Sequence, residues 1–130
     1  MAHRIYLVDD DKFLLDLYAV KFKNAGHEVV TFTGGEEFLN ALRKEGATMP
    51  DAVLLDLVMP GTGGFEVLEV LRKEHLAPQS RIIILSNQGL DSDIEKAKRL
   101  GADGYIIKAS AIPSEVFAET IRIIEAQKSN

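Results

Sequence analysis

Several polar side chains in this sequence stand directly after short apolar runs. They are Asp9 and Asp10 after IYLV, Asp56 after AVLL, Ser86 after IIIL and Lys108 after YII. Clustered carboxylates disfavour one another's ionised form, and a bound divalent cation reverses that preference. Oxygen ligands without cysteine or a neighbouring histidine suit Mg²⁺, with Mn²⁺ as an alternative, better than they suit Zn²⁺. These residues therefore predict a site for a hard divalent cation.

The same residues point to phosphoryl transfer. Mg²⁺ takes one or two carboxylates and binds phosphate oxygens, Lys108 supplies a positive charge, and Ser86 supplies a hydroxyl donor. Positioning and charge neutralisation do most of the catalysis in such reactions, and a carboxylate can itself be the nucleophile. Asp56 is the best candidate, because it stands alone at its strand end while Asp9 and Asp10 can share the metal.

The apolar runs themselves predict buried strands. The runs at 5–8, 52–55, 82–85 and 105–107 are rich in β-branched residues and do not alternate with polar ones. This pattern is typical of parallel strands that are covered on both faces by helices. The run EVVTF at 28–32 is more mixed and suits an edge strand.

Amphipathic helical patterns lie between the runs. The expected helices cover 12–25 (closed by Gly26), 34–45 (opened by Thr33), 64–76, 92–100 (opened by Ser92 and closed by Gly101) and 113–127 (with Pro113 in its first turn). Thr33 with Glu36 has the spacing of a capping box, and glycine is the usual residue just past a helix end.

Strand and helix alternate strictly, so we expect an α/β fold of (βα)₅ type with a doubly wound, five-stranded parallel sheet, in one domain covering 1–130. With the common strand order 2-1-3-4-5, the first and third strands flank the point where ligands bind outside the strands' carboxyl ends. The residues Asp9, Asp10 and Asp56 should then converge, with Ser86 and Lys108 beside them.

Composition excludes several other classes of protein. The 130 residues carry a net charge of −5 and no cysteine, which excludes disulfides and thiolate metal sites and argues against direct nucleic-acid binding. The first residues lack the apolar segment of a signal peptide, and no apolar run approaches the ~18 residues of a membrane span. A cytoplasmic protein without membrane contact is therefore expected.

The motifs at the strand ends resemble those of response regulator receiver domains. They are VDDD (8–11), LLDLVMPGTGG (54–64), ILS (84–86) and GADGYIIK (101–108), in order and each at a strand end. The resemblance covers nearly the whole chain and implies a flavodoxin-like fold and a role in two-component phosphorelay signalling.

The resemblance also implies a role for each residue of the acidic site. Asp56 would accept the phosphoryl group, and Asp10 would bind Mg²⁺ directly together with Asp56. Asp9 would bind the ion through water, and the backbone carbonyl of Val58 would be a further ligand. Asp11 extends the acidic pair and is expected to have no ligand role.

The remaining roles concern the phosphoryl group and the response to it. Ser86 and Lys108 would bind the phosphoryl group, and Tyr105 would be the aromatic switch residue. The donor would be a sensor histidine kinase or a phosphotransfer protein, and the surface of the fourth helix, fifth strand and fifth helix would change its affinity for a downstream protein. The chain would be a signalling module rather than an enzyme, and a monomer, with dimerisation on phosphorylation left open.

Two places depart from the family's usual pattern. Receiver domains usually have Lys-Pro-Phe after the fifth strand, whereas this chain has Lys108, Ala109 and Ser110. Because a non-proline cis peptide costs ~3 kcal/mol, the bond after Lys108 is expected to be trans, or cis under strain. Asn87 and Gln88 follow the hydroxyl residue where a small residue is common, and their amides could contact the phosphoryl group.

Three alternatives remain open on sequence grounds. A Mg²⁺-dependent phosphohydrolase could use the same aspartyl phosphate, although such enzymes often carry an acid two residues after the nucleophile and this chain has Val58 there. A receiver-like interaction module would never be phosphorylated. The acids after the first strand could also simply cap a helix. The histidines His3, His27 and His75 have no metal-like spacing and are expected at the surface.

Overall fold

The computed structural model describes residues 2–126 and contains one sheet of parallel strands in the order β2-β1-β3-β4-β5. The strands are β1 Arg4–Val8, β2 Glu28–Phe32, β3 Ala52–Leu55, β4 Arg81–Ser86 and β5 Gly104–Ile107. Each neighbouring pair is parallel, with Val8 opposite Phe32 and Leu55, and Leu55 opposite Ile84. The predicted fold class, strand order and position of β2 at an edge are confirmed.

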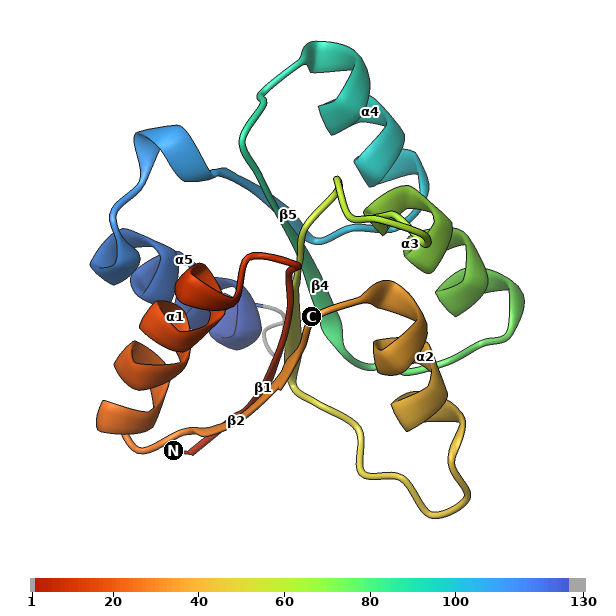
Figure 1. Ribbon diagram of the computed structural model, residues 1–130, viewed down its shortest axis with the longest axis horizontal. Helices are drawn as coiled ribbons and strands as arrows, with labels where there is room; N and C mark the ends of the chain where they lie inside the picture. The colour runs from red at the N-terminus through yellow and green to blue at the C-terminus, as the bar shows by residue number, and fades with distance from the viewer. Residues whose placement is uncertain (1, 127–130) are drawn as a thin grey trace.

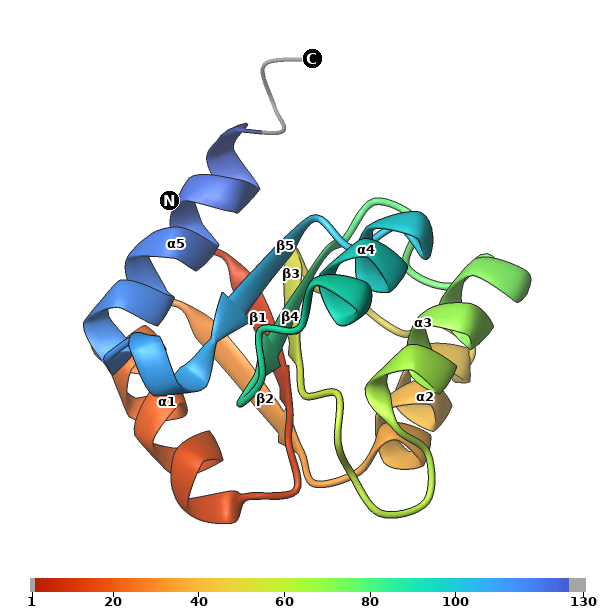
Figure 2. The same cartoon turned by 90° about the horizontal axis from the view of Figure 1, so that it is seen from above.

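Helices cover both faces of this sheet (Figures 1 and 2). They are α1 Lys12–Asn24, α2 Gly35–Arg43, α3 Gly64–Lys73, α4 Asp91–Arg99 and α5 Pro113–Ala126. Helices α1 and α5 lie together on one face, and α2, α3 and α4 lie on the other. None of these described helices is long and apolar enough to cross a membrane.

The two faces of the sheet bury separate apolar clusters. Alternate residues of β3 point to opposite sides, so that Val53 and Leu55 pack with α2 and α3 while Ala52 and Leu54 pack with α1 and α5. All four residues of β3 are buried, which explains why its sequence is continuously apolar. The central strands are thereby held rigidly, and the residues that follow them are presented at a fixed edge.

Two of the predicted helix ends agree with the structure, and two predicted starts are wrong. Gly26 (φ 92°) and Gly101 (φ 91°) lie just beyond the ends of α1 and α4 in the left-handed region, as expected. Thr33 does not cap α2, because its hydroxyl lies 3.3 Å from the carboxylate of Glu37 and Gly34 occupies the cap position. Ser92 lies inside the first turn of α4, which begins at Asp91.

Helices α2 and α3 are shorter than the amphipathic patterns predicted. Helix α3 ends at Lys73, after which His75 (φ 55°) and Ala77 (φ 46°) turn the chain through the left-handed region without a glycine. The sequence thus lacks the usual signal for this helix end. Helix α5 runs to Ala126, and the predicted end at 127 lies outside the described residues.

The expectation that all histidines are surface residues is wrong for His3. Its side chain is buried, and its ring stacks on that of His27 with 5.4 Å between the ring centroids. His75 is exposed, as expected. The burial of His3 arises from a contact between the start of β1 and the residue before β2, which no spacing in the sequence reveals.

Candidate functional site

The residues that follow β1, β3, β4 and β5 meet in one cleft at the carboxyl edge of the sheet. The cleft has a volume of about 410 Å³. It is lined by Asp9, Asp10, Asp11, Leu14, Asp56, Val58, Ser86, Asn87, Gln88 and Lys108. The sequence-based expectation that the strand-end residues converge is therefore confirmed, whereas their individual chemical roles remain predictions.

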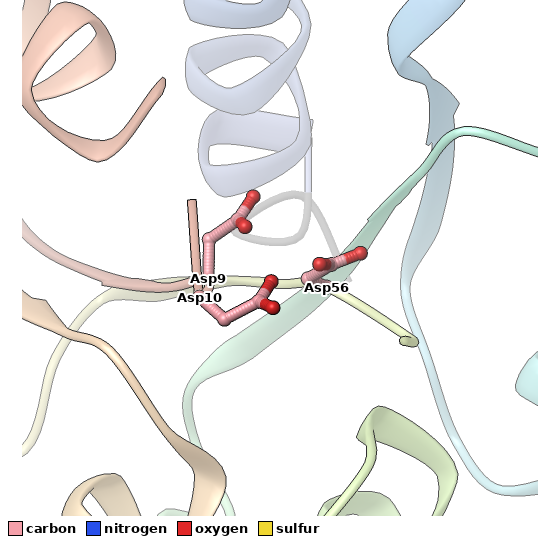
Figure 3. A group of neighbouring side chains, drawn as sticks. All are labelled: Asp9, Asp10 and Asp56. Carbon is pink, nitrogen blue, oxygen red and sulfur yellow. The ribbon is translucent and has the colours of Figure 1, made fainter. Parts of the chain in front are cut away.

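Three carboxylates form the acidic part of this cleft (Figure 3). One oxygen each of Asp9, Asp10 and Asp56 lies within 4.8 Å of the others. Asp9 and Asp56 are buried, whereas Asp10 is exposed. Two buried carboxylates this close repel each other, because little water screens them.

Lys108 brings a positive charge to these acids from the end of β5. Its Nζ lies 2.7 Å from Asp9 Oδ2 and 3.6 Å from Asp56 Oδ1. Burial alone would lower the pKa of Lys108, but the hydrogen bond to Asp9 and the charges of Asp56 and Asp9 outweigh it and raise that pKa. Lys108 therefore stays charged, and one cation faces three carboxylates.

Burial and the neighbouring negative charge change the pKa of Asp56. Burial, followed by the charge of Asp9, raises the pKa of Asp56 to about 6, although Lys108 and a hydrogen bond from the Val58 backbone oppose the rise. Asp56 is ionised at neutral pH but at a free-energy cost, which a cation in the cleft would reduce. A carboxylate in this state is suited to act as a nucleophile that depends on a metal ion.

Asp9 and Asp10 differ in how their carboxylates are engaged. Asp9 accepts hydrogen bonds on both oxygens, from Lys108 Nζ at 2.7 Å and from the backbone N–H of Asp11 at 2.9 Å. Among the described residues, no side chain or backbone group of the protein pairs with the carboxylate of Asp10. Asp10 is therefore free to bind an ion directly, while Asp9 is already held in place.

Asp11 has a structural role, as the helix-capping alternative suggested. It is the N-cap of α1, and its carboxylate accepts a hydrogen bond from the Leu14 N–H at 3.2 Å. This contact satisfies one of the free N–H groups at the start of the helix. The cap orients the turn that carries Asp9 and Asp10 into the cleft.

Ser86 and Tyr105 are linked through the backbone of Gln88. The hydroxyl of Ser86 accepts a hydrogen bond from the Gln88 N–H at 3.2 Å, and the Tyr105 hydroxyl donates to the Gln88 carbonyl at 2.7 Å. Ser86 is buried at the end of β4, and Tyr105 is partly buried on β5. A displacement of the Ser86 hydroxyl would therefore disturb the residue to which Tyr105 is bonded. Sequence reasoning missed this backbone link.

The peptide bond after Lys108 was expected to be either trans or cis under strain. Lys108–Ser110 form a single 3-10 turn, and the described residues contain no cis peptide bond. The peptide after Lys108 is therefore trans. The substitution of Ala109 for proline is compatible with a lysine side chain that points into the acidic cleft.

The donor set fits Mg²⁺. Carboxylate oxygens are its preferred protein ligands, and an open cleft leaves room for the waters and phosphate oxygens that usually complete its coordination. One carboxylate oxygen from each of Asp9, Asp10 and Asp56 is close enough to the other two for the three to surround an ion (Figure 3). The charge excess of the three acids over Lys108 supplies the attraction.

Comparison with known proteins agrees with this geometry. The family model described as the response regulator receiver domain matches residues 5–118. The chain belongs to this family. A receiver domain is the signal-receiving part of a two-component system, and the family binds Mg²⁺ through acidic residues such as those clustered here.

Individual relatives of this receiver domain are longer proteins as well as isolated domains. The regulatory protein VanRc of Enterococcus gallinarum is 33% identical over 83% of this chain and 44% of its own length. DrrB, a Thermotoga maritima OmpR/PhoB homologue, is 31% identical, with a TM-score of 0.81 over 98% of this chain and 54% of that one. A CheY-like receiver domain protein of Methanospirillum hungatei is 25% identical, with a TM-score of 0.86 over 99% of this chain and 98% of that one. This chain thus spans less than half of the curated relative.

Proposed function

We propose that Asp56 of this receiver domain accepts a phosphoryl group from the phosphohistidine of a sensor histidine kinase or a phosphotransfer protein. The observation that carries the proposal is the convergence of three carboxylates and Lys108 in one open cleft. One Asp56 oxygen attacks phosphorus as the bond from phosphorus to the imidazole nitrogen breaks. The imidazole leaves with the electron pair and takes up a proton.

The chain's own residues prepare this step before the donor arrives. Asp10, Asp56 and the backbone carbonyl of Val58 would hold Mg²⁺, with Asp9 bound to it through water. The ion would neutralise part of the charge on Asp56 and on the incoming phosphoryl oxygens. Lys108 keeps Asp9 in position through the contact at 2.7 Å, and it lies 3.6 Å from the proposed acceptor.

Ser86 and Tyr105 would convert phosphorylation into a change of surface. In this proposal the Ser86 hydroxyl turns toward the phosphoryl oxygens and releases the Gln88 N–H to which it is bonded. Tyr105 is attached to the carbonyl of the same residue and lies on β5 beside α4. The surface formed by α4, β5 and α5 would then bind a downstream protein with altered affinity.

The rim of the cleft suits a protein donor. Four large apolar side chains are exposed on the segments around the acids. They are Phe13, Val58, Leu90 and Ile112. Apolar patches rimmed by polar residues commonly mark protein-binding surfaces. A helical kinase domain that carries the phosphohistidine could bury these side chains while its imidazole reaches Asp56.

Neither alternative function gains support from a specific observation. A phosphohydrolase would need a general acid beside the nucleophile, and Val58 offers only its backbone and an exposed apolar side chain. A module that is never phosphorylated would be expected to lack part of the acid and lysine set. In this chain all four of those side chains line the cleft.

The test is intact-mass spectrometry after incubation with acetyl phosphate, in Mg²⁺ or in chelator. We expect one added phosphoryl group on the wild type in Mg²⁺ only, none on Asp56→Asn, and an unchanged result for Asp51→Asn on the opposite edge of the sheet. Adduct formation by Asp56→Asn would contradict the assignment of the acceptor. If the wild type gains no adduct, beryllofluoride binding separates a domain that needs its kinase from one that does not bind phosphoryl groups at all.

A further inference from the structure

A histidine at the amino edge of the sheet is held in one protonation state by the backbone. His27 lies between the end of α1 and the start of β2, and its Nδ1 accepts a hydrogen bond from the backbone N–H of His3 at 2.9 Å. A ring nitrogen can accept this bond only when it carries no proton. The contact therefore requires neutral His27 with its proton on Nε2.

The ring of His27 contacts the residue just before β1 and the helices α1 and α5. It stacks on His3, which precedes Arg4 of β1, with centroids 5.4 Å apart and an interplanar angle of 15°. It also contacts Phe22 of α1 at 6.4 Å and Phe117 of α5 at 5.8 Å between centroids. The hydrogen bond and the ring contacts together connect the start of β1 to both helices.

The titratable and charged groups near this ring belong to the elements packed against it. From α1, Lys21 Nζ lies 5.9 Å from the Phe117 ring, which itself contacts His27. Just before β1, the neighbour is the titratable ring of His3, whose Nδ1 lies 3.8 Å from Asp51 Oδ2. From β2, the adjacent Glu28 is paired with Arg4 at 2.6 Å. From α5, the contacting group is the uncharged ring of Phe117.

We propose that His27 is a proton-sensitive latch that holds the start of β1 against α1 and α5 and releases it when the protein is acidified. Protonation of Nδ1 would turn the acceptor into a donor that faces the His3 N–H. The His3 N–H would then lack a partner beside a buried side chain, which is costly. The start of β1 would open locally while the central strands keep their pairing.

The pKa of His27 is shifted in the direction that the proposed latch requires. Burial, followed by the charge of nearby His3, lowers the pKa of His27 in the folded protein. The unfolded chain binds the proton near the ordinary histidine pKa of about 6.5, whereas the folded chain resists it. The contribution of His27 to stability is therefore present above that pH and is lost as the pH falls below it.

The latch is distinct from the acidic cleft, because it lies at the opposite edge of the sheet. It bears on signalling only through α5, one of the elements whose surface is proposed to respond to phosphorylation. A test of the latch therefore needs no phosphoryl donor. Its failure would leave the proposed function untouched.

Amide hydrogen exchange of the full chain tests the latch directly. Between about pH 8 and about pH 5, the protection factor of the His3 amide should be constant above about pH 6.5, the pKa of an unconstrained histidine. Below that pH it should fall by up to tenfold per pH unit, until the pH reaches the lowered pKa of His27 in the folded protein. His27→Asn offers a side-chain oxygen near the position of Nδ1 and cannot titrate, so its His3 protection should not change with pH. His27→Phe keeps a ring without an acceptor and should be unprotected throughout. His75→Asn is the matched control and should behave as the wild type.

A second measurement keeps the proposal open to refutation if the variants fail to fold. Nitrogen-15 NMR of the wild type at about pH 8 should identify the tautomer of His27 with its proton on Nε2. A proton on Nδ1, or a His3 amide whose protection in the wild type does not change over the same pH range, would overturn the proposal.

Discussion

The two edges of the sheet use charged residues in opposite ways. At the amino edge, polar groups are paired with the backbone: Asp51 Oδ2 accepts the Arg4 N–H at 2.7 Å, and the Ser80 hydroxyl donates to the Pro50 carbonyl at 2.5 Å. At the carboxyl edge, Asp9, Asp10 and Asp56 lie together, and Lys108 pairs only with Asp9 and Asp56 among them. Pairing at one edge stabilises the start of the strands. Crowding at the other edge costs stability and provides an attraction for a metal ion.

The largest expected effect on stability comes from removing the buried cation at the carboxyl edge. Lys108→Met removes the cation and leaves two buried carboxylates without it, so the free energy of unfolding should fall by about 3 kcal/mol. Urea unfolding at neutral pH in chelator measures this. The matched control is Lys12→Met, because Lys12 is 78% exposed in its pair with Asp16 and its loss should have little effect. Equal effects of the two substitutions would contradict the importance of the buried pair.

The same substitution at the two edges should change stability with opposite signs. Asp56→Asn removes an ionised group whose pKa is raised to about 6, and should raise the free energy of unfolding at neutral pH by about 2 kcal/mol. Asp51→Asn weakens a charge-assisted hydrogen bond to the Arg4 N–H, and should lower it by about 1 kcal/mol. Urea unfolding of both variants beside the wild type is the measurement.

The stability difference between Asp56→Asn and the wild type should depend on pH. Because the folded protein holds the Asp56 proton to a higher pH than the unfolded chain, the wild type loses stability from this group as the pH rises from about 4 to about 6. The advantage of Asp56→Asn should therefore be small near pH 4 and complete above the pKa of Asp56. An advantage that is constant across this range would show that relief of charge is not its cause.

Mg²⁺ should stabilise the folded protein, and only the acids at the carboxyl edge should be needed for this effect. At about ten times its dissociation constant, a ligand that binds only the folded state adds about 1.4 kcal/mol. The melting temperature of the wild type should rise accordingly, and that of Asp51→Asn should rise equally. Asp10→Ala removes the carboxylate that has no protein partner, so its melting temperature should not respond. A full Mg²⁺ response in Asp10→Ala would show that the ligand assignment is wrong.

The sequence was a good guide to the carboxyl edge, for a physical reason. Continuously apolar runs such as 52–55 must be buried on both faces, and parallel strands place their carboxyl ends together. The convergence of Asp9, Asp56, Ser86 and Lys108 follows from those two facts. The pairing of Lys108 with Asp9 does not, because the two residues are 99 positions apart and the choice among three acids depends on side-chain geometry.

The amino edge was harder to predict from the sequence. His3 was expected at the surface, but its N–H and ring both meet His27, 24 residues away, and no periodic pattern marks such a contact. The helix starts at Thr33 and Ser92, which follow β2 and β4 on the carboxyl side of the sheet, were mispredicted for a different reason. Side-chain caps compete with other local hydrogen bonds, and here the Thr33 hydroxyl is engaged with Glu37 instead.

The smallest expected effect on stability comes from an exposed ion pair at the amino edge, and it tests whether burial explains the larger effect of the Lys108–Asp9 pair. The ion pair of Arg4 and Glu28 at the amino edge has an N–O distance of 2.6 Å, close to the 2.7 Å of Lys108 and Asp9, but its side chains are 31% and 64% exposed instead of 7% and 5%. Because water and salt screen the exposed pair, Glu28→Gln should lower the free energy of unfolding by only about 0.3 kcal/mol. That loss should vanish in urea titrations at high salt, whereas the loss in Lys108→Met should persist. If both losses vanished at high salt, salt ions would be screening the acidic cleft. The raised pKa of Asp56 would then be caused more by the charge of Asp9 than by burial.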